Sequence, residues 1–365
     1  MIKKILLSLL IIIVILLIYP GCLVWTQVGQ KPRGERLERI RKSPNYDIER
    51  GGFVNATPTV TMTNEDSDSG IVDFLFGKYP DRVPEYALPS VKTDLKHLDK
   101  QSDILVWLGH SSVYMQIDGV RYLFDPVLTN SFPVSVMMKP FRGTDIYTPD
   151  DIPEIDYLII THDHWDHLDY YTVTSIQERV KHVVTPLGVG QHLEYWGYPA
   201  EKLHELDWGE DWTVNENTTI LCLPSRHFSG RMGGHNPTLW ASFLIDGKRK
   251  VYVSGDGGYD ERFKMIGEKY PDIDLVIMEN GQYNKSWSQI HLMPEQLAKA
   301  IDELHPRYAM TYHNSKYKLS VHTWYDPLEE IYQNAQGKTW NLLTPKIGQT
   351  IDMSSPNTDD LWWKD

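Results

Sequence analysis

One segment, "DYLIITHDHWDHLD" at residues 156–169, constrains the fold more than any other part of the 365-residue chain. A run of strand-forming residues is followed at once by metal-capable side chains. His162 and His164 are two residues apart on the extended exit from this strand, so both can point to the same side and reach one metal ion. Asp166 and His167 lie just beyond, where we expect the chain to turn toward a helix, and they suit a second ion nearby.

Three further apolar runs each deliver one donor at their carboxyl end. "TTILCLPSRHFSG" leads to His227, "KVYVSGDGGY" to Asp256, and "RYAMTYHNS" to His313. Since four side chains do not fill two coordination spheres, these residues are the expected additional ligands, and the glycines beside Asp256 let the backbone approach an ion closely. Nitrogen donors with carboxylates fit zinc or another divalent first-row metal. The pattern predicts strands whose carboxyl ends meet at one metal centre.

The chain from Ile104 onward reads as alternating strands and helices. "DYLII" is a buried-strand pattern ending at Thr161, and "ILVWLGH", "SVYMQID" and "VRYLFDP" are shorter strand patterns. The last two are joined at Asp118-Gly119, which predicts a hairpin turn. "MPEQLAKAIDELH" opens with Pro294 and repeats apolar residues at helical spacing. Together these features predict a mixed α/β domain.

The ordered donor set resembles that of the metallo-β-lactamase superfamily. Within that superfamily, "WLGHSSVYMQIDGVRYLFDPVL", "RHFSGR", "TLW", "SGDGGY" and "IHLMPEQ" are similar to the branch that contains N-acylphosphatidylethanolamine-hydrolysing phospholipase D and the ascorbate-phosphate-lactonase-like bacterial proteins. The resemblance covers roughly residues 101–350. It implies an αβ/βα four-layer sandwich of two mixed β-sheets with outer helices, and a metal site at one edge.

The resemblance also implies a ligand set for two zinc ions, with manganese or iron as possible replacements. One ion would be bound by His162, His164 and His227, the second by Asp166, His167 and His313, and Asp256 would bridge them. Two such ions about 3.5–4 Å apart activate a bridging water for attack on phosphorus or a carbonyl carbon. The turn at Asp256 is Gly-Asp-Gly-Gly where Gly-Asp-Thr-Gly is common, and Asn-Ser rather than Trp-Gly follows His313, which leaves the substrate open.

The candidate catalytic residues are Asp166, Asp256 and His291. Since a carboxylate bound to a cation is a poor proton acceptor, Asp166 is assigned to coordination rather than to general-base catalysis. The resemblance places His291 near the pocket, where it could contact a phosphate or donate a proton. Weaker candidates for contact with the site or with lipid, each also explained by a structural role, are His110, Tyr283, Trp287, His322 and the terminal pair Trp362-Trp363, which we expect to be exposed.

The N-terminal stretch "MIKKILLSLLIIIVILLIYPGC" has the architecture of an export signal. In one interpretation, Cys22 becomes the lipidated N-terminus of a bacterial lipoprotein. In the other, the apolar run stays as a membrane anchor, and the positive-inside tendency then holds the main domain in the cytoplasm. That tendency rests on the cations after the run, which are Lys31, Arg33, Arg36, Arg39, Arg41 and Lys42. Both interpretations predict a membrane-associated protein of the bacterial cell envelope.

Charge and cysteine content narrow the remaining possibilities. The formal net charge of -13 repels a phosphate backbone, so we expect no nucleic-acid partner. With only Cys22 and Cys222, the chain has no disulfide framework and no cysteine-based zinc site. The predicted division is a signal or anchor at 1–22, an extension at 23–100, a hydrolase domain at 101–350 and a tail at 351–365.

Three functional hypotheses remain. The first is a zinc-dependent, membrane-associated phosphodiesterase of the phospholipase D type that acts on N-acylphosphatidylethanolamine or a related lipid. The second is a lactonase or another hydrolase of carbon–oxygen esters, since the same nucleophile attacks carbonyl groups. The third is a non-catalytic, metal-holding binding protein of the envelope. The sequence leaves the acyl specificity and the oligomeric state open.

Overall fold

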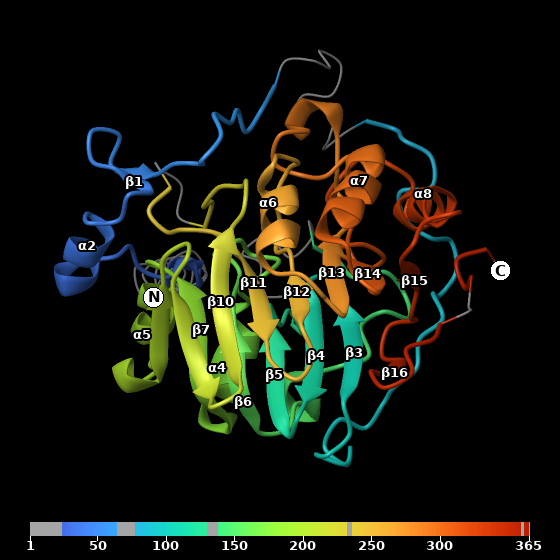
Figure 1. Cartoon of the computed structure of the whole chain (residues 1–365), viewed down its shortest axis with the longest axis horizontal. Helices are drawn as coiled ribbons and strands as arrows, with labels where there is room; N and C mark the ends of the chain where they lie inside the picture. The colour runs from blue at the N-terminus through green and yellow to red at the C-terminus, as the bar shows by residue number, and fades with distance from the viewer. Residues whose placement is uncertain (1–23, 64–76, 130–137, 232–235, 359–360, 365) are drawn as a thin grey trace, which may run out of the picture.

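The computed structural model describes residues 24–63, 77–129, 138–231, 236–358 and 361–364. Within these ranges the chain forms two mixed β-sheets of seven strands each, which pack face to face and carry helices on their outer faces (Figure 1). The predicted four-layer sandwich is confirmed.

The first sheet is antiparallel at one side and parallel at the other. β3, β4 and β5 pair antiparallel, and β5 to β8 pair parallel. Helices α4 (Tyr170–Ile176) and α5 (Gly190–Tyr195) pack against its outer face. The order of its strands is β16 (Thr350–Asp352), β3 (Ile104–Gly109), β4 (Ser112–Ile117), β5 (Val120–Phe124), β6 (Ile155–Ile159), β7 (Val180–Pro186) and β8 (Leu203–Leu206).

The second sheet repeats this plan. β9 to β12 pair antiparallel, and β12 to β15 pair parallel. Helices α6 (Arg262–Lys269), α7 (Pro294–Leu304) and α8 (Asp326–Asn334) cover its outer face. The order of its strands is β15 (Asn341–Leu343), β14 (Tyr308–Tyr312), β13 (Leu275–Glu279), β12 (Val251–Val253), β11 (Ala241–Asp246), β10 (Thr218–Pro224) and β9 (Asp211–Asn215).

The remaining elements are short. Near the N-terminus they are α2 (Gly34–Ile40) and a two-stranded ribbon of β1 (Tyr46–Asp47) and β2 (Gly52–Phe53). The 3-10 helices are η1 (Pro149–Asp151), η2 (Gln177–Arg179), η3 (Ala200–Lys202) and η4 (Lys285–Trp287).

The period-two alternation of β3 explains why this sheet is buried on both faces. Leu105 and Trp107 point between the two sheets, where they join the largest apolar cluster. Val106 and Leu108 point the other way and pack with residues of α4 and α5. A strand that is apolar on both sides needs a layer on each side, and here the second sheet and the helices supply them.

Two local predictions are confirmed by the backbone. Ile117 pairs with Val120 across the hairpin, and Asp118 and Gly119 adopt φ values of 52° and 74°, as a tight turn of this kind requires. Helix α7 begins at Pro294 and ends before His305, whose φ of 49° takes the chain out of the helix.

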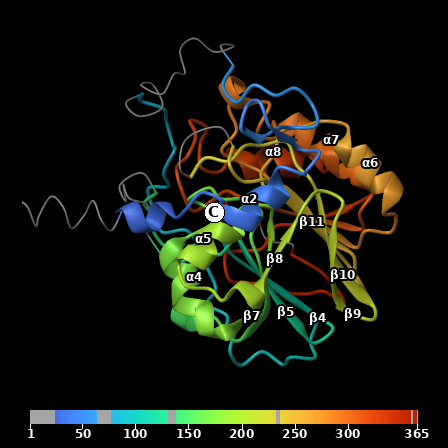
Figure 2. The same ribbon diagram turned by 90° about the vertical axis from the view of Figure 1, so that its left-hand side faces the viewer.

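The described part of the N-terminal region lies on the sandwich. Ile40 and Phe53 form an apolar cluster with Leu187, Leu239 and Trp240. Figure 2 shows the blue N-terminal segment crossing close to α5, where the Arg36 guanidinium donates to Glu194 and Glu205. These ion pairs tie α2 to the first sheet and its outer helix.

No helix in the described ranges is long and apolar enough to cross a bilayer. The predicted signal or anchor at residues 1–22 lies outside those ranges.

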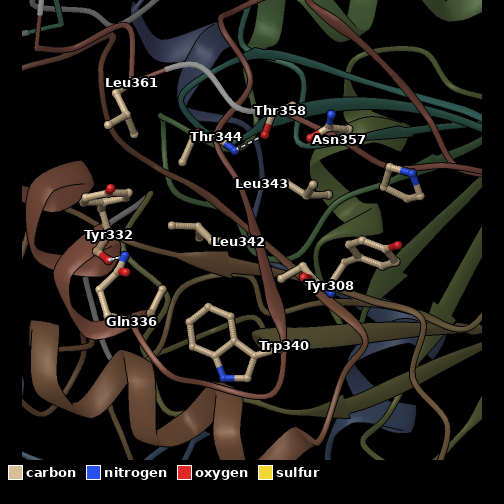
Figure 3. Close-up of a pocket in the computed structure, with 13 residues that line it drawn as sticks. Tyr308, Tyr332, Gln336, Trp340, Leu342, Leu343, Thr344, Asn357, Thr358 and Leu361 are labelled. Carbon is tan, nitrogen blue, oxygen red and sulfur yellow. Dashed lines mark hydrogen bonds between the residues drawn. The ribbon is translucent and has the colours of Figure 1, made fainter.

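The expectation that the terminal tryptophans are exposed is wrong. Trp362 and Trp363 are 2% and 5% exposed, and both belong to the central apolar cluster. The Trp362 indole donates to the carbonyl of Thr344, 3.2 Å away, which satisfies its polar atom. Nearby, the tail residue Leu361 lines a surface pocket with Tyr332 of α8 (Figure 3). The tail is therefore part of the core. The sequence of the tail alone does not reveal this, because the residues that bury the two tryptophans lie elsewhere in the chain.

We expect Trp362→Ala to lower the free energy of unfolding by about 3–5 kcal/mol, because it removes a large buried ring and leaves a cavity. Urea unfolding followed by circular dichroism measures the change. The matched control is Trp25→Ala, since Trp25 is 70% exposed and its loss should change stability by less than about 0.5 kcal/mol. Equal stabilities of the two variants would contradict the packing described for the tail.

Candidate metal centre

The predicted donors gather at one edge of the sandwich because of strand direction. β3, β5 and β6 run the same way in the first sheet, and β10, β12, β13 and β14 run the same way in the second. Carboxyl ends of strands that run alike meet at one edge, where loops carry side chains into a shared space. The residues at these ends are His110, Asp125, the segment 162–167, His227, Asp256, Glu279 and His313.

One group of donors consists of His162, His164, His227 and Asp256, whose ligand atoms all lie within 4.8 Å of one another. His227 Nε2 is 3.1 Å from His164 Nδ1. Asp256 Oδ2 is 3.8 Å from His227 Nε2 and 3.9 Å from His162 Nε2. Three nitrogens and one carboxylate oxygen at these separations can surround a single cation.

A second group consists of Asp166, His167 and His313, and the structure adds His110 to it. Asp166 Oδ2 is 3.3 Å from His313 Nε2 and 3.9 Å from His167 Nε2. Asp256 reaches this group as well, with Oδ1 3.2 Å from His167 Nε2 and Oδ2 3.3 Å from His313 Nε2. Asp256 therefore lies between the two groups, where a bridging carboxylate would have to be.

The strand that leads to this loop is shorter than predicted. β6 ends at Ile159 rather than at Thr161. The reason is a change of partner, because the Thr161 N–H donates to the Asp125 side chain at 2.7 Å instead of to a neighbouring strand. The chain leaves the sheet there, and His162 and His164 still face the same space, with ring centroids 4.5 Å apart.

Hydrogen bonds behind the rings orient the histidines. His167 Nδ1 is 2.8 Å from Asp125 Oδ2, His227 Nδ1 is 2.9 Å from the Ile290 carbonyl, and His162 Nδ1 is 3.0 Å from Thr161 Oγ1. A proton on Nδ1 in each bond leaves the Nε2 lone pair toward the cluster. This is the arrangement that metal-binding histidines use, since the outer partner fixes both tautomer and ring direction.

Asp125 is one of the outer residues that the sequence interpretation does not single out. Its side chain is fully buried and also accepts from the Thr161 hydroxyl at 2.6 Å. The available signal was its place directly after the strand pattern "VRYLF", the same position that the predicted ligands occupy after their strands. It holds both ends of the histidine-rich loop, since it binds the His167 ring and the backbone of Thr161 before His162.

The electrostatics of the cluster fit a cation. Burial, reinforced by neighbouring imidazoles, lowers the pKa of His162 and His227 well below the usual range, so both rings stay neutral, as metal binding requires. Burial also lowers the pKa of His167, but the charges of Asp256, Asp125 and Asp166 outweigh it and raise that pKa well above its usual range. These carboxylates create a negative potential in which a positive charge is strongly favoured.

Unsatisfied atoms give the direct test of fit. His162 Nε2, His167 Nε2 and Asp256 Oδ1 are buried, point into the cluster and make no hydrogen bond. Buried polar atoms without a partner are rare in folded proteins, and each one needs an explanation. Cations between these atoms would provide it, so the donor set present is compatible with divalent metals.

His110 has both a structural role in its turn and a contact with the site. Its backbone carbonyl accepts from His313 N–H and from the Trp107 indole, each at 2.9 Å. Its buried ring also reaches the site, because Nε2 is 2.9 Å from Asp166 Oδ2 and the ring lies 4.2 Å from that of His313. His110 therefore orients Asp166 from the side of the first sheet.

His291 lies beside the cluster and is hydrogen-bonded to a carboxylate. Its Nδ1 is 2.7 Å from Glu279 Oε2, and its ring centroid is 5.2 Å from that of His227. Burial lowers the pKa of His291, but the charge of Glu279 and the hydrogen bond to it prevail and raise the pKa to about 9. Glu279 was not predicted, although it ends the apolar run "LVIM" as the ligands end theirs.

The weaker candidates have structural partners. His322 Nε2 accepts from the Gln282 N–H at 2.8 Å, and its Nδ1 is 2.8 Å from the Thr323 carbonyl, so both ring nitrogens serve the backbone. The Tyr283 hydroxyl bonds Asp326 at the start of α8. The Trp287 indole donates to the Gln282 carbonyl at 2.7 Å. These contacts give all three residues a structural role in holding the segment around Gln282.

The N-terminal region supports two loops that carry the candidate ligands. Asn55 clamps the backbone of His227, accepting from its N–H at 3.0 Å and donating to its carbonyl at 2.8 Å. The buried Arg231 guanidinium connects the Gln27 carbonyl with that of Leu168, just after the histidine-rich loop. Polar segments such as that around Asn55 give no sequence signal for such a role, because the partners are distant in the chain.

An apolar cluster adjoins the second group of donors. It contains Val127, Met138 and Tyr317, with Trp165 and Leu319 packed against them. The ring of Tyr317 lies 5.0 Å from that of His110, and Trp165 belongs to the histidine-rich loop itself. The candidate metal centre therefore has polar donor groups with an apolar cluster on one side.

Comparison with known proteins agrees with this architecture. The family model described as "Beta-lactamase superfamily domain" matches residues 120–314. An uncharacterized protein of Mycobacterium tuberculosis is 33% identical over 334 residues, 88% of each chain. The N-acyl-phosphatidylethanolamine-hydrolyzing phospholipase D 1 of Caenorhabditis elegans is 31% identical over 273 residues, 68% of this chain and 75% of the relative. The structure of a metallo hydrolase from Ignicoccus hospitalis superposes with a TM-score of 0.53 at 21% identity, covering 68% of this chain and 97% of that one.

We expect Asp125→Asn to weaken metal binding by about 10–100-fold, because the His167 ring loses the partner that fixes its direction. Competition with a chromogenic chelator measures the affinity. Asp156→Asn is the control, since Asp156 binds Lys181 at the far end of β6 and should leave the affinity unchanged. Equal affinities of Asp125→Asn and the unaltered protein would contradict the orienting role.

Proposed function

This chain belongs to the metallo-β-lactamase superfamily, some of whose members are named as metal-dependent hydrolases, and we propose that it is a dinuclear phosphodiesterase of the phospholipase D type. Its substrate would be N-acylphosphatidylethanolamine or a related lipid. One observation carries the proposal: buried imidazoles and carboxylates converge with unsatisfied atoms at one edge of the sandwich.

The proposed ligand assignment follows the two donor groups. His162, His164 and His227 would hold one ion, Asp166, His167 and His313 would hold the other, and Asp256 is placed to serve both groups. When bound, two divalent ions supply an activated water and neutralise charge on the phosphate. Zinc suits this set of imidazole nitrogens and carboxylate oxygens, and manganese or iron would fit the same donors.

The remaining chemistry falls to the side chains of the protein. Water oxygen forms a new bond to phosphorus while the bond from phosphorus to the alcohol oxygen breaks, and that oxygen leaves with a proton. His291 is placed to donate this proton through Nε2, since Nδ1 is engaged by Glu279. Asp166 is held by His110 and His313 and has no free role as a base.

Two observations favour a lipid over a small polar ester. The apolar cluster with Trp165 and Leu319 flanks the donor groups and offers a surface for an acyl chain. The Caenorhabditis elegans relative, which aligns over 68% of this chain, carries the name of an enzyme that hydrolyses N-acyl-phosphatidylethanolamine.

Membrane association is part of the proposal and rests on the sequence before residue 23. The apolar run with Lys3 and Lys4 ahead of it and Cys22 behind it would tether the hydrolase to the envelope, either as a lipoprotein or as an anchored protein. A tether would keep the site close to a substrate that itself resides in the bilayer.

The decisive experiment presents the zinc-loaded protein with vesicles of N-acylphosphatidylethanolamine, with phosphatidylethanolamine, with a water-soluble phosphodiester and with simple lactones. We expect release of N-acylethanolamine from the first and much slower turnover of the others. Preference for lactones would instead establish a carbon–oxygen hydrolase. Full metal content without turnover of any compound would favour the non-catalytic binding protein and overturn the proposal.

Substitution of single ligands tests the assignment. We expect His164→Ala and His227→Ala each to lose one ion per chain and to reduce kcat/KM by more than about 100-fold, the upper end of what loss of an outer partner costs. Metal analysis and initial rates are the measurements. His97→Ala is the control, since His97 is an exposed residue outside the centre and should behave as the unaltered protein.

Removal of the metals tests their role independently. Treatment with a chelator should abolish turnover, and added zinc or manganese should restore it, because the proposed nucleophile depends on bound ions. The same treatment should lower Tm, since ions that bind only the folded state stabilise it. A chelated protein of unchanged Tm and rate would contradict a resident metal centre.

A further inference from the structure

Glu279, the last residue of β13, is a buried carboxylate whose two oxygens are both occupied. Its side chain is 1% exposed. Oε2 is 2.7 Å from His291 Nδ1, while Oε1 accepts from the Leu292 N–H at 2.9 Å and from the Gly257 N–H at 3.1 Å. Glu279 thus joins three parts of the site: the ring of His291, the backbone after it, and the turn that carries Asp256.

Glu279 also lies within ligand distance of Asp256, His291 and His313, a set that could hold another cation. Its hydrogen bonds argue against that use. Each oxygen already accepts a hydrogen bond from an N–H group, and a cation at the same oxygens would have to displace these bonds. The contacts of Glu279 are those of a group that orients its neighbours.

The neighbour it orients faces the donor cluster. The ring of His291 stacks on His313 with centroids 5.6 Å apart and an angle of 20° between the planes. With Nδ1 held by Glu279, Nε2 at the opposite side of the ring is the atom left for contact with a substrate. Rotation of the ring would break the bond to Glu279, so the carboxylate selects both the tautomer and the direction of the ring.

We propose that Glu279 is a positioning residue that fixes His291 with its Nδ1–H toward the carboxylate and its Nε2 toward the scissile phosphodiester, and that holds the Asp256 turn through the Gly257 N–H. This inference rests on the proposed function and adds a residue to it. In the reaction, the proton leaves His291 Nε2 for the alcohol oxygen as the phosphorus–oxygen bond breaks. Glu279 keeps the Nδ1 proton in place and undergoes no net change.

The kinetic test compares Glu279→Gln with Glu303→Gln. The amide of Glu279→Gln preserves size but cannot match the charge-assisted bond to His291. We expect kcat to fall about 10–100-fold, KM to change less than twofold, and metal content to stay the same, since no ligand is removed. Glu303 accepts from the Tyr259 hydroxyl away from the centre, so Glu303→Gln should retain full activity. Unchanged kcat in Glu279→Gln, or loss of metal from it, would overturn the positioning role.

A second background shows whether Glu279 acts through His291. In a His291→Ala protein, the additional change Glu279→Gln should cost less than about twofold in kcat, because the ring that it positions is gone and the glutamine oxygen can still accept from the Gly257 N–H. An equal loss in both backgrounds would instead show that Glu279 acts only through the Asp256 turn, and the proposal would be wrong.

A spectroscopic measurement separates this inference from the proposed function. In protein labelled with 15N-histidine and loaded with zinc, the His291 ring signals are those that vanish in His291→Ala. We expect its Nδ1 proton to resonate downfield and to lose that position in Glu279→Gln. An unchanged signal would overturn the inference even if the protein hydrolyses lipids. A shifted signal would support it even if every phosphodiester is left intact.

Discussion

The cost of taking charge out of water governs this structure. Asp125 and Asp256 are buried, with the half-buried Asp166 close to them, and carboxylates in such surroundings repel one another unless positive charge lies between them. Burial holds the pKa of His162 and His227 low and keeps both rings neutral, whereas the carboxylates act together on His167 and raise its pKa. The cluster therefore carries more negative than positive charge. Hydrogen bonds around it hold the carboxylates in place although they repel one another.

Strand direction makes such a cluster possible with only a few residues after each strand. In each sheet, the strands that lead to the centre run the same way, so a single polar residue after an apolar run reaches the common edge. The rule extends beyond the ligands, since Asp125 follows β5 and Glu279 ends β13. Two layers of polar residues, those facing the cations and those behind them, therefore come from one topological feature.

The sequence indicated the donors because they stand in a regular relation to strands, and that relation is local. Asp125 and Glu279 obey the same relation but were not singled out, because a lone carboxylate after a strand is common in proteins. Asn55 gave no signal at all, since its role comes from His227, 172 residues away in the chain. The burial of Trp362 was misjudged for the same reason, because its partner Thr344 and the core around it are brought together only by the fold. What could be predicted depended on periodicity, and what could not depended on contacts between distant segments.

The contacts of the N-terminal region have a consequence for biosynthesis. Gln27 is bound by Arg231 and Asn55 by Trp240, which follow 204 and 185 residues later. At translation rates of about 5–20 residues per second, the first of these segments waits roughly 10 to 40 s for its partner to be made. This early stretch obtains these partners only after β9 and β10 of the second sheet have been made. In the nascent chain, the loop that carries His162 and His164 is therefore not connected to the N-terminal region until Arg231 has been made.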